Sequence, residues 1–291
     1  MRFFLPILKG LAFLVFAFPR VVYLAVGDFL GATVFYVFRF RRDLVLKHLE
    51  MAFPARNLKE RQALAKKSYQ HQGRTLLEYA LIPFLNRDNI GQRVATEGDE
   101  HLRSALKEGK GVLLLTAHMG NGDLALVALA LLGYPVQSIS KRFRSEWLNR
   151  LWFGLRESKG IRYIPEEKSS FQILRALRDN QVVAFVLDQF MGPPAGVRTK
   201  FFGHETGTAV GLALFAQRTR APVVPAFTYR RPNGQHVIRF EAPLDTSSFT
   251  KDDAGLTQAT QLFNDQIERW VCLHPEQWMW LHRRWKTFEV R

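Results

Sequence analysis

Hydrophobic and polar positions follow two different patterns along the chain. Residues 3–18 and 21–38 are apolar apart from Lys9 and Asp28, and a Pro-Arg pair separates the two stretches. Later in the chain, short apolar runs rich in β-branched residues alternate with segments of helical character. Near-continuous apolar runs are typical of buried parallel strands. The pattern therefore predicts an apolar helical N-terminus followed by an α/β domain.

The apolar runs place individual strands and helices. Buried strands are expected over 111–118 and 182–187, and residues 223–229 and 236–241 should form a hairpin around Asn233-Gly234. The expected helices cover 41–53, 57–85, 123–132, 169–179 and 256–273. Strands that alternate with helices predict an α/β fold whose mixed, largely parallel central sheet is flanked by helices.

The helix over 57–85 has a clear start signal. Asn57 stands at the N-cap position, and Glu60 follows three residues later, as in a capping box.

We expect two units in the chain. Residues 1–40 should form a membrane-anchoring helical segment, and residues 41–291 the folded domain.

The N-terminal segment suits a membrane surface. Neither apolar stretch quite reaches the roughly 20 uncharged residues that a spanning helix needs. The basic residues Arg39, Arg41 and Arg42 follow the second stretch, an arrangement suited to a segment lying in, or dipping into, an anionic leaflet. A cleaved signal peptide and a buried helical hairpin remain alternatives.

Charge narrows the class of partner. The 291 residues carry a formal net charge of +15, which implies a negatively charged partner, either nucleic acid or anionic lipid. Many of the 24 phenylalanines fall in the first forty residues, outside any nucleic-acid-binding pattern, so lipid is favoured. The single cysteine, Cys272, cannot form an internal disulfide. No cluster of Cys and His suggests a metal site.

The stretch LLLTAHMGNGDLAL, residues 113–126, carries the candidate chemistry. His118 falls at the carboxyl end of a predicted strand, where α/β proteins place functional groups. Gly120 and Gly122 allow a tight turn that brings Asp123 within reach of the imidazole. An imidazole held by a carboxylate acts as a base toward a substrate hydroxyl. Alternatively, His118 ends a strand and Asp123 only caps the next helix.

Five sequence blocks in order resemble one family. They are KHLEMAFP (47–54), GRTLLE (73–78), HMGNGD (118–123), LDQFMGPPAGVRTKFFG (187–203) and PEQWMWLHRRWK (275–286). Together they resemble the bacterial lipid A late acyltransferases, the lauroyl and myristoyl acyltransferase family of the lysophospholipid acyltransferase-like superfamily. The chain departs from the family pattern at His48, where asparagine is usual, and at Asp123, where many relatives have glutamate.

The resemblance implies an activity. A fatty acyl group would move from a thioester on acyl carrier protein or coenzyme A to a glycolipid hydroxyl, with a lipid A precursor as the first candidate acceptor. Phosphatidylinositol mannosides and aminolipids are alternative acceptors. The resemblance implies that the enzyme is a monomer on the cytoplasmic face of the bacterial inner membrane. It also implies that no cofactor is needed beyond the acyl thioester. From charge alone, a non-catalytic protein that binds anionic lipid or nucleic acid remains an alternative. A hydrolase has no support, because the sequence contains no G-x-S-x-G motif.

The resemblance also implies a set of site residues. The catalytic pair is His118 and Asp123, and the substrate-binding candidates are Asn121, Arg142, Arg156, Asp188, Gln189 and Gly192. Phosphates and a developing oxyanion need cations and N–H donors, which the arginines and the backbone near Gly192 offer. The arginines are equally compatible with a solvated basic face. Asp188 could also support His118, or only make a hydrogen bond within its loop.

The C-terminal block and the pair Phe201 and Phe202 contain further candidate residues. Trp278, Trp280 and Trp285, with Arg283 and Arg284, are expected at the membrane interface, where amphipathic aromatic and basic side chains are favoured. Phe201 and Phe202 either line an acyl pocket or pack in the core, and His204 is expected on the surface.

Overall fold

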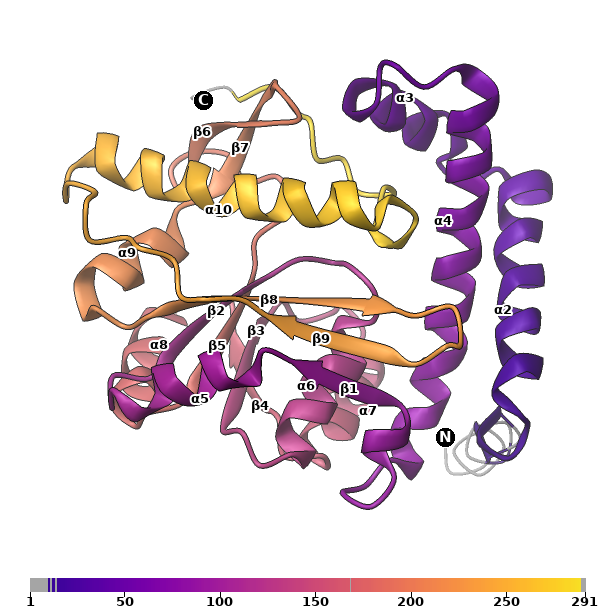
Figure 1. Cartoon of the computed structure of the whole chain (residues 1–291), viewed down its shortest axis with the longest axis horizontal. Coiled ribbons are helices and arrows are strands. Elements are labelled where there is room, and N and C mark those ends of the chain that lie inside the picture. Colours follow the sequence, from indigo (N-terminus) through magenta and orange to yellow (C-terminus); the bar gives the residue numbers. More distant parts are fainter. Residues whose placement is uncertain (1–9, 11, 14, 168, 289–291) are drawn as a thin grey trace.

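The computed structural model describes residues 10, 12–13, 15–167 and 169–288, and within them seven strands form a central β-sheet. These strands are β1 (Val94–Glu97), β2 (Val112–Thr116), β3 (Val136–Ser140), β4 (Arg162–Pro165), β5 (Val182–Val186), β8 (Val223–Arg230) and β9 (His236–Phe240). Their order is β1-β9-β8-β2-β5-β3-β4, as Figure 1 shows. Neighbours run parallel except β8 and β9, the predicted hairpin, which pair antiparallel. The mixed, largely parallel sheet is confirmed.

Helices pack on both faces of this sheet. They are α2 (Arg20–Thr33), α3 (Arg42–Ala52), α4 (Leu58–Glu78), α5 (Asp99–Lys107), α6 (Gly122–Leu131), α7 (Glu146–Glu157), α8 (Ser169–Arg178), α9 (Gly211–Thr219) and α10 (Asp253–Leu273). Shorter turns of other helical types are η1 (Val34–Phe38), η2 (Tyr79–Phe84), η3 (Ile90–Gln92) and η4 (Pro275–Gln277). The predicted capping box is present, with Asn57 and Glu60 exchanging hydrogen bonds of 2.8 and 3.1 Å.

Alternate residues of the strands feed two separate cores. In β2, Leu113 and Leu115 pack with α8, α9 and α10, whereas Val112 and Leu114 pack with α5 and α6 on the opposite face. Successive side chains of a strand point to opposite faces, so an uninterrupted apolar run such as β2 must be covered on both. The three-layer arrangement follows from that pattern (Figure 1).

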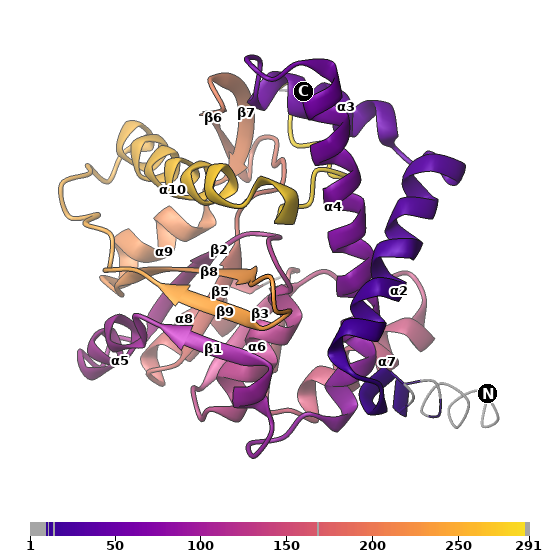
Figure 2. The ribbon, with the colours of Figure 1, turned by 45° about the vertical axis from the view of Figure 1, so that its right-hand side comes forward.

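The helix α2 lies antiparallel along α4 at one side of the molecule (Figure 2). The backbones approach so closely that a Cβ atom on Gly31 would lie 2.2 Å from the carbonyl oxygen of Tyr69. Asp28, the charge that interrupts the second apolar stretch, forms an ion pair with Arg74 of α4 at 2.5 Å. The charge of Asp28 in an otherwise apolar helix is therefore explained by its ion pair with α4.

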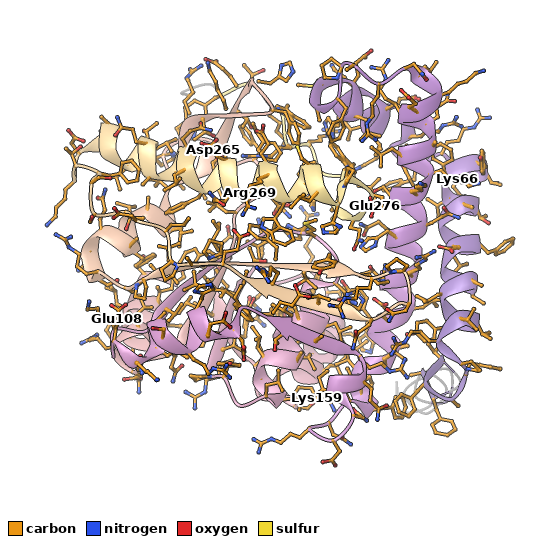
Figure 3. All side chains as sticks on the ribbon, in the orientation of Figure 1. Lys66, Glu108, Lys159, Asp265, Arg269 and Glu276 are labelled. Carbon is orange, nitrogen blue, oxygen red and sulfur yellow. The ribbon has the colours of Figure 1, made fainter. Side chains whose placement is uncertain are left out.

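Residues Arg20–Phe38 form the one helical stretch among the described residues that is long and apolar enough to cross a membrane. The first predicted apolar stretch, 3–18, lies largely outside the described residues. Lys66 of α4, labelled in Figure 3, lies 5.5 Å from the centroid of the Tyr36 ring of η1, the turn that follows α2. The proposed division at residue 40 stays a prediction.

The C-terminal block lies inside the protein, and its predicted place at the membrane interface is wrong for most of its residues. Of the five residues predicted there, Trp278, Trp280 and Arg284 are fully buried, Trp285 is half-buried and Arg283 alone is exposed. Each indole N–H has an internal acceptor, such as the Pro275 carbonyl at 2.6 Å for Trp280. An indole whose polar group is satisfied inside gains nothing from an interface.

A separate antiparallel hairpin, β6 (Gly196–Phe201) and β7 (His204–Ala209), covers this block. Phe201 is fully buried and stacks near Trp278 and Trp285, with ring centroids 5.6 and 5.7 Å away, so it packs in the core. His204 is exposed, as predicted.

Candidate active site

A cavity of about 1410 Å³ lies at the carboxyl ends of β2 and β5. These strands pair in parallel with Thr116 opposite Val186, so the segments that follow them emerge side by side. His118 and Asp188 each stand two residues beyond that pair. Parallel register therefore brings together two residues that are 70 positions apart in the sequence.

The imidazole of His118 is held by Asp188. His118 Nδ1 donates to Asp188 Oδ1 at 2.8 Å, and the His118 backbone N–H donates to Asp188 Oδ2 at 3.0 Å. The Trp278 indole N–H adds a third bond to the carboxylate at 2.7 Å. The expected contact between His118 and Asp123 is wrong, because Asp123 lies in the first turn of α6 and faces another partner.

This pairing sets the charge of both groups. Burial lowers the pKa of His118, but the Asp188 carboxylate and its hydrogen bond outweigh burial and raise the pKa above 6.5. Burial raises the pKa of Asp188, yet His118 and the N–H donors outweigh it, so the carboxyl stays ionised. About one third of the His118 side chain remains exposed, whereas Asp188 is buried. With Nδ1 bonded to the carboxylate, Nε2 is the nitrogen that faces the cavity.

Asp123 instead anchors Arg156. The two side chains form a buried ion pair, and the Arg156 guanidinium lies 4.9 Å from the centroid of the Trp152 ring. Burial lowers the pKa of Arg156 to about 10, so the group stays charged at neutral pH. Its Nε is buried without a hydrogen-bond partner among the described residues. Asp123 and Arg156 both line the cavity, and the ion pair holds the Arg156 cation in place there; Lys141, Arg218 and Lys251 line other parts of the wall.

Gln189 also enters the cavity, between two histidines. Its amide nitrogen lies 3.2 Å from His118 Nε2 and 3.0 Å from His282 Nε2. The two rings stand 5.2 Å apart between centroids. His282 was not among the predicted site residues, although the C-terminal block that resembles the family contains it.

Three other predicted residues lie outside the cavity lining. Arg142 is exposed and pairs with Glu146 at 3.2 Å. The carbonyl of Gly192 accepts a backbone hydrogen bond from Gly196 at 2.9 Å, inside its own loop. Asn121 is buried and caps α6, with its side-chain oxygen 3.1 Å from the Leu124 nitrogen.

A buried polar network supports the turn after His118. Glu78, at the end of α4, accepts hydrogen bonds from Arg230 at 2.8 Å and from Asn121 at 3.0 Å. His71 connects Arg230, 2.7 Å away, to the carbonyl of Gly120 at 3.0 Å. These partners come from α4 and β8, and no spacing in the sequence pointed to them.

Much of the remaining cavity wall is apolar, although polar side chains such as Ser138, Glu166 and Thr228 also line it. The apolar residues of the wall include Leu114, Leu126, Leu129, Ile173, Phe185 and Phe215. Among the described residues, no group of three or more His, Cys, Asp or Glu is placed to hold a metal ion. A partly exposed imidazole, a cation and a large cavity with much apolar wall suit proton abstraction from an alcohol beside an aliphatic chain.

Comparison with known proteins identifies the family of this chain. Residues 3–287 match the family model described as bacterial lipid A biosynthesis acyltransferase. The lipid A biosynthesis lauroyltransferase of Escherichia coli K12 is 28% identical over 281 residues, covering 96% of this chain and 90% of the relative.

Two further relatives differ from the lauroyltransferase in the acceptor or in the acyl group that their names give. The phosphatidylinositol mannoside acyltransferase of Mycobacterium tuberculosis H37Rv is 29% identical over 224 residues, 75% of this chain and 69% of the relative. The lipid A biosynthesis palmitoleoyltransferase of E. coli K12 is 23% identical over 293 residues, 97% of this chain and 90% of the relative. The family match spans nearly the whole chain and includes every residue of the site, so this protein is an acyltransferase and belongs to the bacterial lipid A biosynthesis acyltransferase family.

Proposed function

We propose that this protein transfers a fatty acyl group from a thioester, on acyl carrier protein or coenzyme A, to a hydroxyl of a lipid A precursor. The observation that carries the proposal is the His118–Asp188 pair at the wall of a large cavity that is lined mainly by apolar residues. Similarity to the lauroyltransferase over 96% of the chain supports the choice of acceptor. A phosphatidylinositol mannoside is the second candidate acceptor, supported by the mycobacterial relative.

The reaction uses His118 as the general base. Its Nε2 takes the proton of the acceptor hydroxyl as the oxygen attacks the thioester carbonyl carbon, forming the new C–O bond. The C–S bond of the tetrahedral intermediate then breaks, and His118 returns the proton to the departing sulfur. Asp188 keeps the ring in the correct tautomer and stabilises the imidazolium that forms between the two steps.

Arg156 supplies positive charge. We assign it to the oxyanion of the intermediate or to a phosphate of a substrate, since it is buried, charged and held in place by Asp123. In this assignment Asp123 acts through Arg156, not through the base. The reaction requires no cofactor beyond the thioester, because side chains carry out each proton transfer.

The protein is proposed to work as a monomer on the cytoplasmic face of the inner membrane. Exposed apolar side chains on the outer side of α2 support a membrane contact: Val21, Val22, Val26, Phe29 and Leu30. Because α2 packs along the strongly polar α4, we place it in the membrane surface rather than across the bilayer. The net charge of +15 suits an anionic leaflet.

Acyl transfer to purified acceptors tests the proposal. Membranes containing the protein receive acyl carrier protein or coenzyme A thioesters and either acceptor, and products are identified by mass spectrometry. We expect His118→Ala to abolish transfer, whereas His101→Ala, a change on the distant α5, retains it. Unchanged transfer by His118→Ala excludes this base, and binding of lipid without transfer by the wild type indicates a non-catalytic protein.

A further inference from the structure

The C-terminal segment after η4 is attached to both halves of the active site. The backbone N–H of Met279 donates to the carbonyl of His118 at 3.0 Å. The Arg284 guanidinium donates to the carbonyl of Gln189 at 3.1 Å. Between these two attachments, His282 lines the cavity. The segment therefore fixes the His282 ring relative to the base and to the residue after Asp188.

When His118 is neutral, the state in which it can act as a base, the hydrogen bonds around Gln189 admit one consistent set of donors. Because Nδ1 of His118 donates to Asp188, its Nε2 can only accept. The group 3.2 Å away must then be the amide NH₂ of Gln189, which has a second hydrogen for His282 Nε2 at 3.0 Å. His282 Nε2 is thus an acceptor as well, and its own proton lies on Nδ1.

The surroundings of His282 agree with a neutral ring. Burial, the facing His118 and the nearby Arg41 all lower the pKa of His282, and only Asp188 opposes them. A neutral imidazole can accept the amide hydrogen, whereas an imidazolium cannot. The four groups Asp188, His118, Gln189 and His282 therefore form one continuous hydrogen-bonded chain.

We propose that His282 is a positioning residue for acyl transfer that acts through the Gln189 amide. This role rests on the proposed function. In the free enzyme one amide hydrogen covers the reactive nitrogen of His118. When the acceptor hydroxyl takes that place, the bond to His282 retains the amide beside the base, with its other hydrogen free to donate to the substrate oxygen.

Replacement by two amides separates hydrogen bonding from packing. In His282→Gln the side-chain oxygen reaches the position of Nε2 and can accept from Gln189, whereas His282→Asn reaches only the position of Nδ1. We expect kcat to fall about tenfold in the Asn and Ala variants, the usual value of one hydrogen bond, and to stay within about threefold of wild type in the Gln variant. Arg283→Ala, exposed and adjacent, is the matched control.

A double-mutant cycle with Gln189→Ala tests whether the effect passes through the amide. If it does, His282→Ala lowers kcat no further once Gln189 is alanine. Full additivity of the two losses overturns the proposal, as does equal loss in the Gln, Asn and Ala variants, which indicates packing alone. Wild-type kcat in His282→Ala overturns it too.

Side-chain ¹⁵N NMR of protein labelled at histidine provides a test that needs no turnover. We expect His282 to be neutral near pH 7 with its proton on Nδ1, the tautomer that is the minor one for free histidine, and to lose this preference in Gln189→Ala. A proton on Nε2 in the wild type overturns the proposal. This readout separates failure of the positioning role from failure of the proposed acyl transfer.

Discussion

The two acidic residues of the site serve different partners. Asp188 holds the imidazole of His118, whereas Asp123 holds the guanidinium of Arg156. A carboxylate bonded to the ring raises its basicity, and one bonded to an arginine only fixes the position of a cation. Substitution of each carboxylate should therefore have a distinct kinetic signature.

Asp188→Asn should lower kcat by roughly 10²- to 10⁴-fold, the range of general-base catalysis. The wild-type base works only when neutral, so activity falls as pH drops through the raised pKa of His118. Without the carboxylate that pKa decreases, and the acid limb of the kcat/KM profile moves to lower pH. Asp123→Asn is the control, because the limb should stay in place.

Arg156→Ala should reduce kcat/KM by roughly 10²-fold, as loss of an oxyanion or phosphate contact does. Arg142→Ala should change it less than about threefold, since Arg142 lies in an exposed ion pair. Steady-state assays with both substrates varied distinguish them. Similar losses in both variants contradict the assignment of Arg156 as the cation of the cavity.

Sequence alone could identify His118, Asp188, Arg156 and Gln189 as residues near the reaction, because their types and the family blocks point there. It could not pair them. The partner of His118 depends on which strand lies beside β2. That strand is β5, which follows β2 in the chain only after two other strands, β3 and β4, and their helices.

At the scale of elements, the strongest patterns gave correct predictions. The apolar runs of β2 and β5, the Asn-Gly hairpin and the capped α4 all appear near their expected bounds. The pattern did not predict α7, in which polar and apolar residues mix, or the short strands β3 and β4. These elements gain stability mainly from neighbours that the sequence does not reveal.

The buried network between α4 and β8 allows a stability prediction. Glu78→Gln should lower the free energy of unfolding by about 3–5 kcal/mol, because it leaves the charge of Arg230 buried without a counter-ion. Glu97→Gln, which removes part of a half-exposed pair with Arg231, should cost less than about 1 kcal/mol. Urea unfolding monitored by tryptophan fluorescence compares the two, and equal losses contradict the prediction.

At the scale of the whole molecule, the apolar N-terminal region around α2 and the outer side of α7 lie near each other. Phe16, before α2, stacks on Phe84 of η2 at 5.1 Å, and Tyr79 of η2 contacts Trp152 of α7 at 4.8 Å. On the outer side of α7, Trp147 and Leu151 are exposed, four residues apart on one face. The same helix directs Arg156 into the cavity, so α7 connects the expected membrane surface with the site.

The double variant Trp147→Glu, Leu151→Glu should therefore lose activity on an acceptor embedded in anionic vesicles, by about tenfold or more from the lost apolar burial. Activity on a short-chain acceptor below its micellar concentration should stay near wild type. Phe171→Glu, on α8 at the opposite side of the sheet from α2 (Figure 1), should alter neither. Equal loss in both assays contradicts a role at the membrane.

The glycine contact between α2 and α4 has a mechanical consequence. A Cβ atom on Gly73 would lie 2.1 Å from the Gly27 carbonyl oxygen, so the backbones of the two helices are in direct contact. With α2 in the leaflet, as proposed above, this contact should hold His118 at a fixed height relative to the acyl chains. We then expect glycolipids whose free hydroxyl lies at another height to be poor acceptors.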